Sequence, residues 1–486
     1  MATYKHVYIV YKRDIGPKAK KDSGAIKRVY YYDQPANVKP PDDGYGVLEF
    51  FTWKTFAKDR FRIDDGKMEE VRVRAKFVKS TRVHEHSDDG TGRYDIVLVS
   101  DKVDSSTGFG TQTNYLYRGL MAKGHNVHAL HFQEADTLLN LRFDYVISLG
   151  DFYQVNGANE YPDLVEMGLD NWIHWLPISN TEIDEEFWKR IRAPRHLVAM
   201  SSFGHKTLTG RGFSNTTFIP HGIEMDIFRP LHMAELEKLR KSYQVADQFV
   251  VVFVGRNTKR KRIDHLLEIF AKVIESTGND APVKFLLKTE EQYTHINVTQ
   301  YAKELDRKKD INLHEHIMLY DENVTPGQLN ELYNLATVGI SATGGEGFGL
   351  TTLECIAAGV PMIIGRHSTS EEILGDTGVA GSLIDISETQ TDHPHGVAVG
   401  RSILDADQAV NVLLEFYKKW ENDQVPNRLA VRAQVKGRYT VNSMVDAWDS
   451  LLYDLSLSKE EDEGAEEAVS YRRVADLDEP ISLPEI

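Results

Sequence analysis

Two series of short apolar runs, each followed by a helical pattern, constrain the fold of this chain more than any other feature. The first series begins with YDIVLVS at residues 94–100, and the second begins with QFVVVFVG at residues 248–255. Short buried strands that alternate with helices predict parallel sheets covered by helices on both faces. The sequence therefore predicts an α/β fold with two doubly wound domains, and its 486 residues are enough for two or three cores.

The two ends of the chain do not follow this pattern. Residues 1–92 predict a small β-rich, antiparallel module, in which VRVRAKFVK at 71–79 alternates apolar and basic side chains like a half-buried strand. This module carries 19 Lys and Arg against 14 acids, which leaves a basic strand face. Residues 459–486 are acidic and poor in apolar side chains, which predicts a disordered tail.

Composition excludes several classes of protein. The net charge is −16, from 57 basic and 73 acidic residues, and opposes nonspecific binding to nucleic acid or anionic membranes. The single cysteine, Cys355, rules out a disulfide within the chain and suits a reducing compartment. The first residues lack the apolar core of a signal peptide, and no run approaches the roughly 20 apolar residues of a membrane span. The sequence therefore predicts a cytoplasmic protein without a membrane span.

The stretch GGEGFGLTTLECIAAGVP at residues 344–361 carries the clearest chemistry. It follows the apolar strand VGISAT, and a helix over 350–358 is ended by Gly359 and Pro361. The glycines therefore lie in a turn from strand to helix, where unpaired backbone N–H groups at the positive end of the helix attract phosphate. Glycines also let a ligand approach the backbone closely.

Two acids beside such an anion site need a partner other than phosphate. Glu346 lies in the loop and Glu354 lies on the helix, seven residues later. A nucleotide sugar satisfies both demands, since its pyrophosphate can meet the loop amides while carboxylates accept hydrogen bonds from its hydroxyls. We expect Glu346 to reach the sugar and Glu354 the ribose, with the diphosphate at Gly347, Phe348, Gly349 and Leu350. The alternative is that Glu346 is a helix-start charge and Glu354 a solvated helix residue.

Three segments in order resemble one family. EGFGLTTLECIAAGVPMI resembles the Glu-x7-Glu signature of retaining GT-B glycosyltransferases, the group that includes glycogen and sucrose synthases. VVFVGRNTKRKRIDHLLEIF resembles the group's basic element, and IPHGIEMDIFRP its interdomain element, although His221 replaces the usual Asn and Glu224 the usual Asp. The resemblance covers roughly residues 94–455.

The resemblance implies a GT-B fold, in which two Rossmann-like domains face each other across a cleft. The acceptor domain would comprise residues 93–228, the donor domain residues 229–437, and a helix at 438–458 would rejoin the first domain.

The resemblance also assigns roles to individual residues. Arg256 and Lys261 match the basic pair that binds the donor pyrophosphate, and with Glu346 they form the implied catalytic set. Lys259, Arg260 and Arg262 crowd the same segment, so the choice of Lys261 among them is open.

Three further positions come from the first domain. Gly108 and Gly110, in the loop STGFGT after the first strand, match glycines near the diphosphate. His174, in NWIHWLPIS, is the candidate for a histidine near the sugar; the alternative is a packed, hydrogen-bonded core histidine.

The function implied is transfer of a sugar from a nucleotide-diphosphate sugar to an unidentified hydroxyl acceptor, with retention of configuration. No cofactor beyond the donor is expected, and no metal, because the His-Glu-His at 84–86 lies in a linker. Alternatives are a GT-B phosphorylase or epimerase, and a sugar-nucleotide-binding protein without activity. The acceptor could be a glycan, a protein, a small molecule or hydroxylated bases in DNA, the last because of the basic face at 71–79.

Overall fold

The computed structural model describes residues 94–457, except 106, 158–160, 294 and 376–377, together with the backbone of short strands before residue 69. The basic stretch 71–79, the His-Glu-His at 84–86 and the tail at 459–486 lie outside the described residues. Before residue 69, three strands pair antiparallel in the order β2-β1-β3, and a further short pair follows: β1 (His6–Lys12), β2 (Ile26–Tyr32), β3 (Tyr45–Phe50), β4 (Ile63–Asp64) and β5 (Lys67–Met68).

The first α/β domain is built on a six-stranded parallel sheet in the order β11-β10-β9-β8-β6-β7. Its strands are β6 (Asp95–Ser100), β7 (Asn126–His131), β8 (Tyr145–Leu149), β9 (Trp172–Leu176), β10 (His196–Ala199) and β11 (Thr216–Phe218). Its helices are α2 (Gly108–Ala122), α3 (Leu164–Met167), α4 (Glu185–Arg190) and α5 (Ser202–Gly210), with 3-10 turns η1 (Phe132–Asn140) and η2 (Phe152–Gln154). Apolar strands such as β8 are buried on both faces, as parallel sheets require.

The second domain repeats the architecture, with a parallel sheet in the order β14-β13-β12-β15-β16-β17. Its strands are β12 (Phe249–Val254), β13 (Val283–Lys288), β14 (Ile317–Tyr320), β15 (Val338–Ser341), β16 (Met362–Gly365) and β17 (Gly381–Ile384). Its helices are α6 (Met233–Ser242), α7 (Ile263–Thr277), α8 (Val298–Lys309), α9 (Leu313–His316), α10 (Pro326–Leu335), α11 (Leu350–Ala357), α12 (Ser370–Leu374), α13 (Ala406–Glu421) and α14 (Arg428–Ala433), with the 3-10 turn η4 (Lys259–Lys261). The predicted α/β fold with two doubly wound sheets is confirmed.

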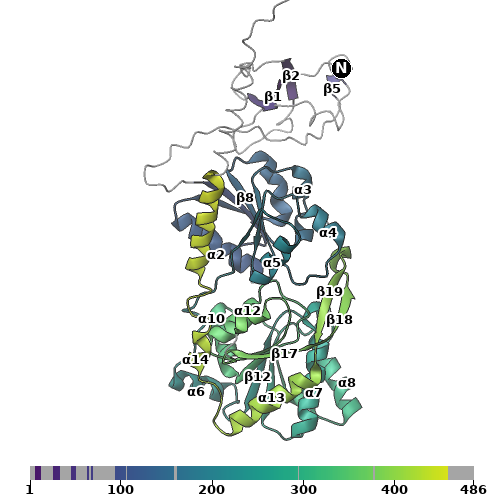
Figure 1. Ribbon diagram of the computed structural model, residues 1–486, viewed down its shortest axis with the longest axis vertical. Helices are drawn as coiled ribbons and strands as arrows, with labels where there is room; N and C mark the ends of the chain where they lie inside the picture. Colours follow the sequence, from purple (N-terminus) through teal and green to yellow (C-terminus); the bar gives the residue numbers. More distant parts are fainter. Residues whose placement is uncertain are drawn as a thin grey trace, which may run out of the picture.

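An antiparallel hairpin interrupts the second domain between β17 and α13. It consists of β18 (Ile386–Asp392) and β19 (Val399–Leu404), joined through the turn η5 (Pro394–Gly396). In Figure 1 the hairpin stands at the edge of the molecule and rises beside α4 of the first domain.

The chain crosses between the domains twice, along neighbouring paths. The backbone N–H of Ile223 donates to the carbonyl of Tyr439 at 3.0 Å, and a bridge pairs Ile223 with Thr440. After the second crossing, a helix over residues 441–457 lies along the first domain (Figure 1). Its Trp448 is fully buried against Trp175 of β9, with ring centroids 5.2 Å apart. One apolar cluster therefore runs from the first sheet through the crossings into the second domain.

Candidate active site

The loops that follow β12 and β15 meet at one end of the second sheet. Because these two parallel strands are neighbours, the loops at their carboxyl ends emerge side by side. The backbone N–H of Gly344 donates to the carbonyl of Arg260 at 2.8 Å, which joins the glycine-rich loop to the basic turn η4. The fold thus brings together two segments that are about 85 residues apart, as the sequence predicts.

Glu346 sits at the centre of this junction. Its carboxylate accepts from Lys261 Nζ at 2.5 Å and pairs with Arg260 Nη1 at 3.0 Å, and the Glu346 side chain is only 17% exposed. Burial opposes ionisation, but the two cations overcome it and hold the pKa of the Glu346 carboxyl well below its usual range. Glu346 is therefore a charged, oriented carboxylate.

The side chains of the basic segment point in different directions. Lys261 is buried, whereas Lys259 turns outward to Asp392 at 3.0 Å. Arg256, the other predicted pyrophosphate ligand, is 56% exposed; its Nε lies 3.6 Å from Glu290, and its guanidinium stacks 4.3 Å from the Tyr293 ring centroid. The structure therefore brings Lys261, but not Arg256, into contact with Glu346.

Arg260 is a member of the site that sequence reasoning missed. Besides pairing with Glu346, it donates from Nη1 to the carbonyl of Gly345 at 2.7 Å, so it fixes both the carboxylate and the loop. In a run of four basic residues, the sequence does not reveal which side chains point inward. The 3-10 turn over Lys259–Lys261 and the left-handed backbone of Arg262, with φ 51°, decide it.

The helix α11 begins directly after Gly349 of the glycine-rich loop. Gly349 has φ 101°, a left-handed conformation that favours glycine, and it turns the chain into α11. Glu354 on this helix accepts a hydrogen bond from the hydroxyl of Tyr333 at 3.0 Å. Burial raises the pKa of Glu354 to about 7, although the bond from Tyr333 opposes the shift. Glu354 is thus not the solvated helix residue of the alternative interpretation.

The glycine-rich loop packs directly on the first domain. A Cβ on Gly347 would lie 2.3 Å from Cβ of Pro177, and one on Gly345 would lie 2.7 Å from the carbonyl oxygen of Ser179. We predicted that these glycines admit a ligand; the close approach that the structure shows is to the loop after β9. The first reason for glycine at these two positions is therefore contact between the domains.

The two glycines predicted in the first domain, Gly108 and Gly110, also lie close to other parts of the chain. Gly108 begins α2, and a Cβ there would lie 3.3 Å from Cδ1 of Leu350, so the first turns of α2 and α11 face each other. A Cβ on Gly110, in the first turn of α2, would lie 2.0 Å from Ser105 Oγ, so this glycine lets the helix pack against the loop that precedes it. Two helix N-termini at one seam give a place where a diphosphate would be stabilised from both sides.

The side chain of Phe348 fills the seam next to this place. It is 3% exposed and lies between the rings of His221 and Tyr439, with centroids 5.2 and 5.6 Å away. Burial lowers the pKa of His221 to about 3. The histidine that departs from the family's usual Asn is therefore a neutral packing residue at the domain crossing.

Comparison with known proteins agrees with the family resemblance found in the sequence. Residues 236–392 match the family model described as glycosyl transferases group 1. The matched residues lie within the second α/β domain, which is thus similar to this family. An alpha-galactosylglucosyldiacylglycerol synthase of Streptococcus pneumoniae is 26% identical over 172 residues, which are 35% of this chain and 43% of that protein. The chain spans less than half the length of the curated relatives it matches.

Solved structures share the fold of the whole two-domain body. A sucrose-phosphate synthase from Thermosynechococcus elongatus has a TM-score of 0.58 at 15% identity, over 75% of this chain and 100% of that chain. The Anabaena protein HepE in complex with UDP-glucose has a TM-score of 0.52 at 15% identity, over 75% and 100%. The fold is therefore GT-B, as predicted.

His174 lies within the first sheet, in β9, and not in the loop after β9 that meets the second domain. It is fully buried in the first sheet, where Nδ1 bonds to Ser148 Oγ at 2.7 Å and the ring packs against Trp172 and Phe152. Burial lowers its pKa to about 3. This environment is that of the packed, hydrogen-bonded core histidine.

A second domain contact lies near the crossings. Glu372 of α12 in the second domain reaches the first turn of α5 in the first domain. Its Oε2 accepts from the backbone N–H of Ser202 at 2.9 Å, from the Ser202 hydroxyl at 2.5 Å and from the N–H of Phe203 at 3.2 Å. A carboxylate of one domain thus caps a helix of the other.

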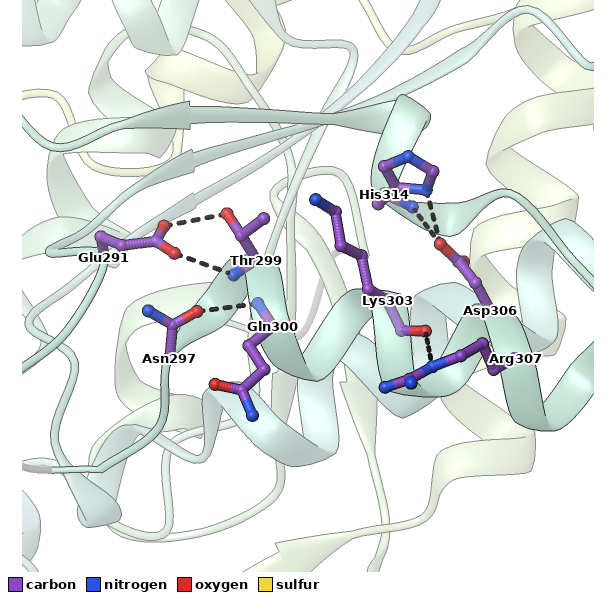
Figure 2. A pocket seen from close by; sticks show the side chains of 8 residues that line it. All are labelled: Glu291, Asn297, Thr299, Gln300, Lys303, Asp306, Arg307 and His314. Carbon is purple, nitrogen blue, oxygen red and sulfur yellow. Dashed lines mark hydrogen bonds and ion pairs between the residues drawn. The ribbon is translucent and has the colours of Figure 1, made fainter.

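The second domain also has a hollow outside the predicted site. This hollow has a volume of about 630 Å³ and lies along α8. Figure 2 shows its lining residues, among them Glu291, Asn297 and Lys303. Its polar groups already bond to one another, for example the Glu291 carboxylate to the N–H of Thr299 at 3.2 Å. It contains none of the predicted site residues.

Within the described part of the chain, no three His, Cys, Asp or Glu side chains group as ligands for a metal ion. Among the same residues, no helix combines the length and apolar character needed to cross a bilayer.

Proposed function

We propose that this protein is a glycosyltransferase that binds a nucleoside diphosphate sugar at the seam between its domains and transfers the sugar to a hydroxyl group. The observation that carries the proposal is the charged carboxylate of Glu346, held by Arg260 and Lys261 beside the N-termini of α11 and α2. The group 1 match and the HepE complex with UDP-glucose support a nucleotide sugar as donor.

Each charged group of the site is assigned a separate role in this reaction. When the bond from the anomeric carbon to the diphosphate breaks, negative charge grows on the departing oxygen, and Arg260 and Lys261 stabilise it together with the helix N-termini. Glu346 accepts hydrogen bonds from the sugar hydroxyls, and Glu354 accepts them from the ribose. Arg256, whose side chain is 56% exposed, is available to the outer phosphate.

We further propose that the reaction retains the anomeric configuration and needs no metal ion. The acceptor hydroxyl would attack from the face that the diphosphate leaves and give its proton to the departing phosphate oxygen. No protein nucleophile is required, and the two cations take the place that a metal would have beside the phosphates.

The first test is a thermal-shift series with UDP-glucose, GDP-mannose and ADP-glucose on the full chain, followed by measurement of nucleotide release. A specific donor raises the melting temperature through linkage, and Glu354→Ala abolishes this rise. Glu275→Ala on α7, which removes an exposed partner of Lys309 on α8, is the control and keeps the rise. No stabilisation by any donor, or an unchanged response in Glu354→Ala, would contradict the proposed donor site.

The finer proposals have separate tests. NMR of the anomeric proton in the product reports retention, and inversion would refute the front-face reaction. Turnover that continues in excess EDTA supports metal independence, and loss of turnover restored by a divalent cation would refute it.

A further inference from the structure

The β18–β19 hairpin of the second domain forms backbone hydrogen bonds with the first domain. The N–H of Gly400 donates to the carbonyl of Glu182 at 2.9 Å, and the N–H of Asp184 donates to the carbonyl of Ala398 at 3.0 Å. A bridge pairs Ile183 with Val399 between these two bonds. In Figure 1 the hairpin lies at the edge of the molecule opposite α14 and the helix at 441–457, so the domains are joined at both edges.

The same hairpin is bonded to the glycine-rich loop. The N–H of Ser402 donates to the carbonyl of Gly344 at 2.9 Å, and a Cβ on Gly344 would lie 3.1 Å from Cβ of Arg401. Since Gly344 also donates to Arg260, it is held between β19 and the basic turn. The start of the loop that carries Glu346 is therefore positioned by the hairpin.

Arg401 joins these contacts with a buried charge. The residue is 7% exposed, its Nη1 donates to Ser179 Oγ at 3.1 Å, and its Nε lies 3.8 Å from Asp392 Oδ2. Ser179 is the residue whose carbonyl touches Gly345. Arg401 thus reaches from the hairpin, past the start of the loop, to the segment of the first domain on which the loop rests.

A buried arginine with these partners needs a reason. Removing a guanidinium from water is unfavourable unless the guanidinium is well paired. Here the Nε atom has no hydrogen-bond partner among the described residues. The partly exposed guanidinium of Arg260 repels Arg401, and the carboxylates of Asp392, Asp151 and Glu346 oppose this effect. A hairpin that only joined the domains could do so with the backbone bonds alone.

We propose that Arg401 is a positioning residue: by binding Ser179 across the domain seam, it fixes the Gly344–Glu346 turn in its working position when the domains are together. The part that concerns catalysis rests on the role proposed for Glu346. The part that concerns position does not, because the turn is held whether or not a sugar is transferred.

Hydrogen exchange tests the position without any donor. In Arg401→Ala we expect the amides of Gly344 and Asp184 to exchange at least about tenfold faster, because local opening becomes easier. Arg401→Lys restores part of the protection. Arg307→Ala is the matched control, since this exposed arginine of the same domain bonds from Nε to the carbonyl of its own helix residue Lys303. Unchanged exchange at both amides in Arg401→Ala would overturn the proposal.

A double-mutant cycle tests the link across the seam. Ser179→Ala removes the partner of Arg401, so the double variant should be no worse than Arg401→Ala alone. In turnover with the donor found by thermal shift, Arg401→Ala should lower kcat by about 10- to 100-fold, as a misplaced group does, with donor KM nearly unchanged. Effects that multiply independently, or a raised KM with unchanged kcat, would show that Arg401 does not position the turn through Ser179.

Discussion

The substitution Glu354→Gln distinguishes the destabilisation caused by the buried carboxylate from the role of that carboxylate in donor binding. In the folded protein the pKa of Glu354 is raised from an ordinary value of 4.5 to about 7 by burial, with Tyr333 as its hydrogen-bond donor. Between these two values the folded state binds more protons than the unfolded state, so the free energy of unfolding falls as pH rises. Below about 4.5 the stabilising contribution is fully present, and above about 7 it is lost.

The size of the effect follows from the two pKa values. Between pH 5 and pH 8.5 the wild-type protein should lose about 2.5 kcal/mol of unfolding free energy through Glu354, and a glutamine at this position avoids that loss. For a domain of about 200 residues this is a relative shift of roughly 5–10 °C in melting temperature.

Thermal unfolding of the ligand-free protein at the two pH values measures the shift. As pH rises, the melting temperature of Glu354→Gln should increase relative to that of wild type. The donor, however, should no longer stabilise this variant. Tyr333→Phe removes the bond that favours the charged form, so its stability should fall more steeply with pH than that of wild type. If Glu354→Gln and wild type keep a constant difference from pH 5 to pH 8.5, the carboxylate is not in the low-dielectric environment inferred here.

Three further predictions concern the seam and its charges. Gly347→Ala forces a Cβ against Pro177 and should lower turnover at least tenfold, whereas Gly210→Ala, with open space around its Cβ, should leave kinetics unchanged; equal kinetics in both variants would refute the contact. Lys261→Ala should reduce kcat by about 10²–10³, the usual loss of a group that stabilises developing charge, and a loss confined to KM would contradict that role. Donor binding near pH 6.5 should release protons, because ribose hydroxyls lower the pKa of Glu354; calorimetry in buffers of different ionisation enthalpy measures the release, and its absence would separate Glu354 from the donor.

The sequence predicts the elements that depend on local pattern. Alternation of apolar strands and helices predicts both sheets, and the shared carboxyl edge of neighbouring parallel strands brings Lys261 to Glu346. The same pattern predicts that α11 starts at its glycines and carries Glu354 inward.

What the sequence does not predict depends on backbone conformations and long-range contacts that leave no periodic pattern. The directions of the basic side chains at 259–262 are set by a 3-10 turn and one left-handed residue, and no periodicity signals these. The β18–β19 hairpin is largely polar, and its contacts with residues 180–184 join segments more than 200 positions apart. His174 fits a sequence motif only loosely, and its place in the middle of β9 decides its environment.

The contact between Glu372 and the first turn of α5 bears on how such proteins can be recombined. Ser201 satisfies the N–H of Gly204 from within the first domain, while the N–H groups of Ser202 and Phe203 depend on a carboxylate borrowed from the other lobe. A chimera that joins a foreign second domain to this first domain leaves α5 with an incomplete N-terminal cap, unless the foreign domain carries an acid at the same place. The two domains are therefore not freely exchangeable between related proteins. A chimera is best designed so that α5 and α12 come from the same parent.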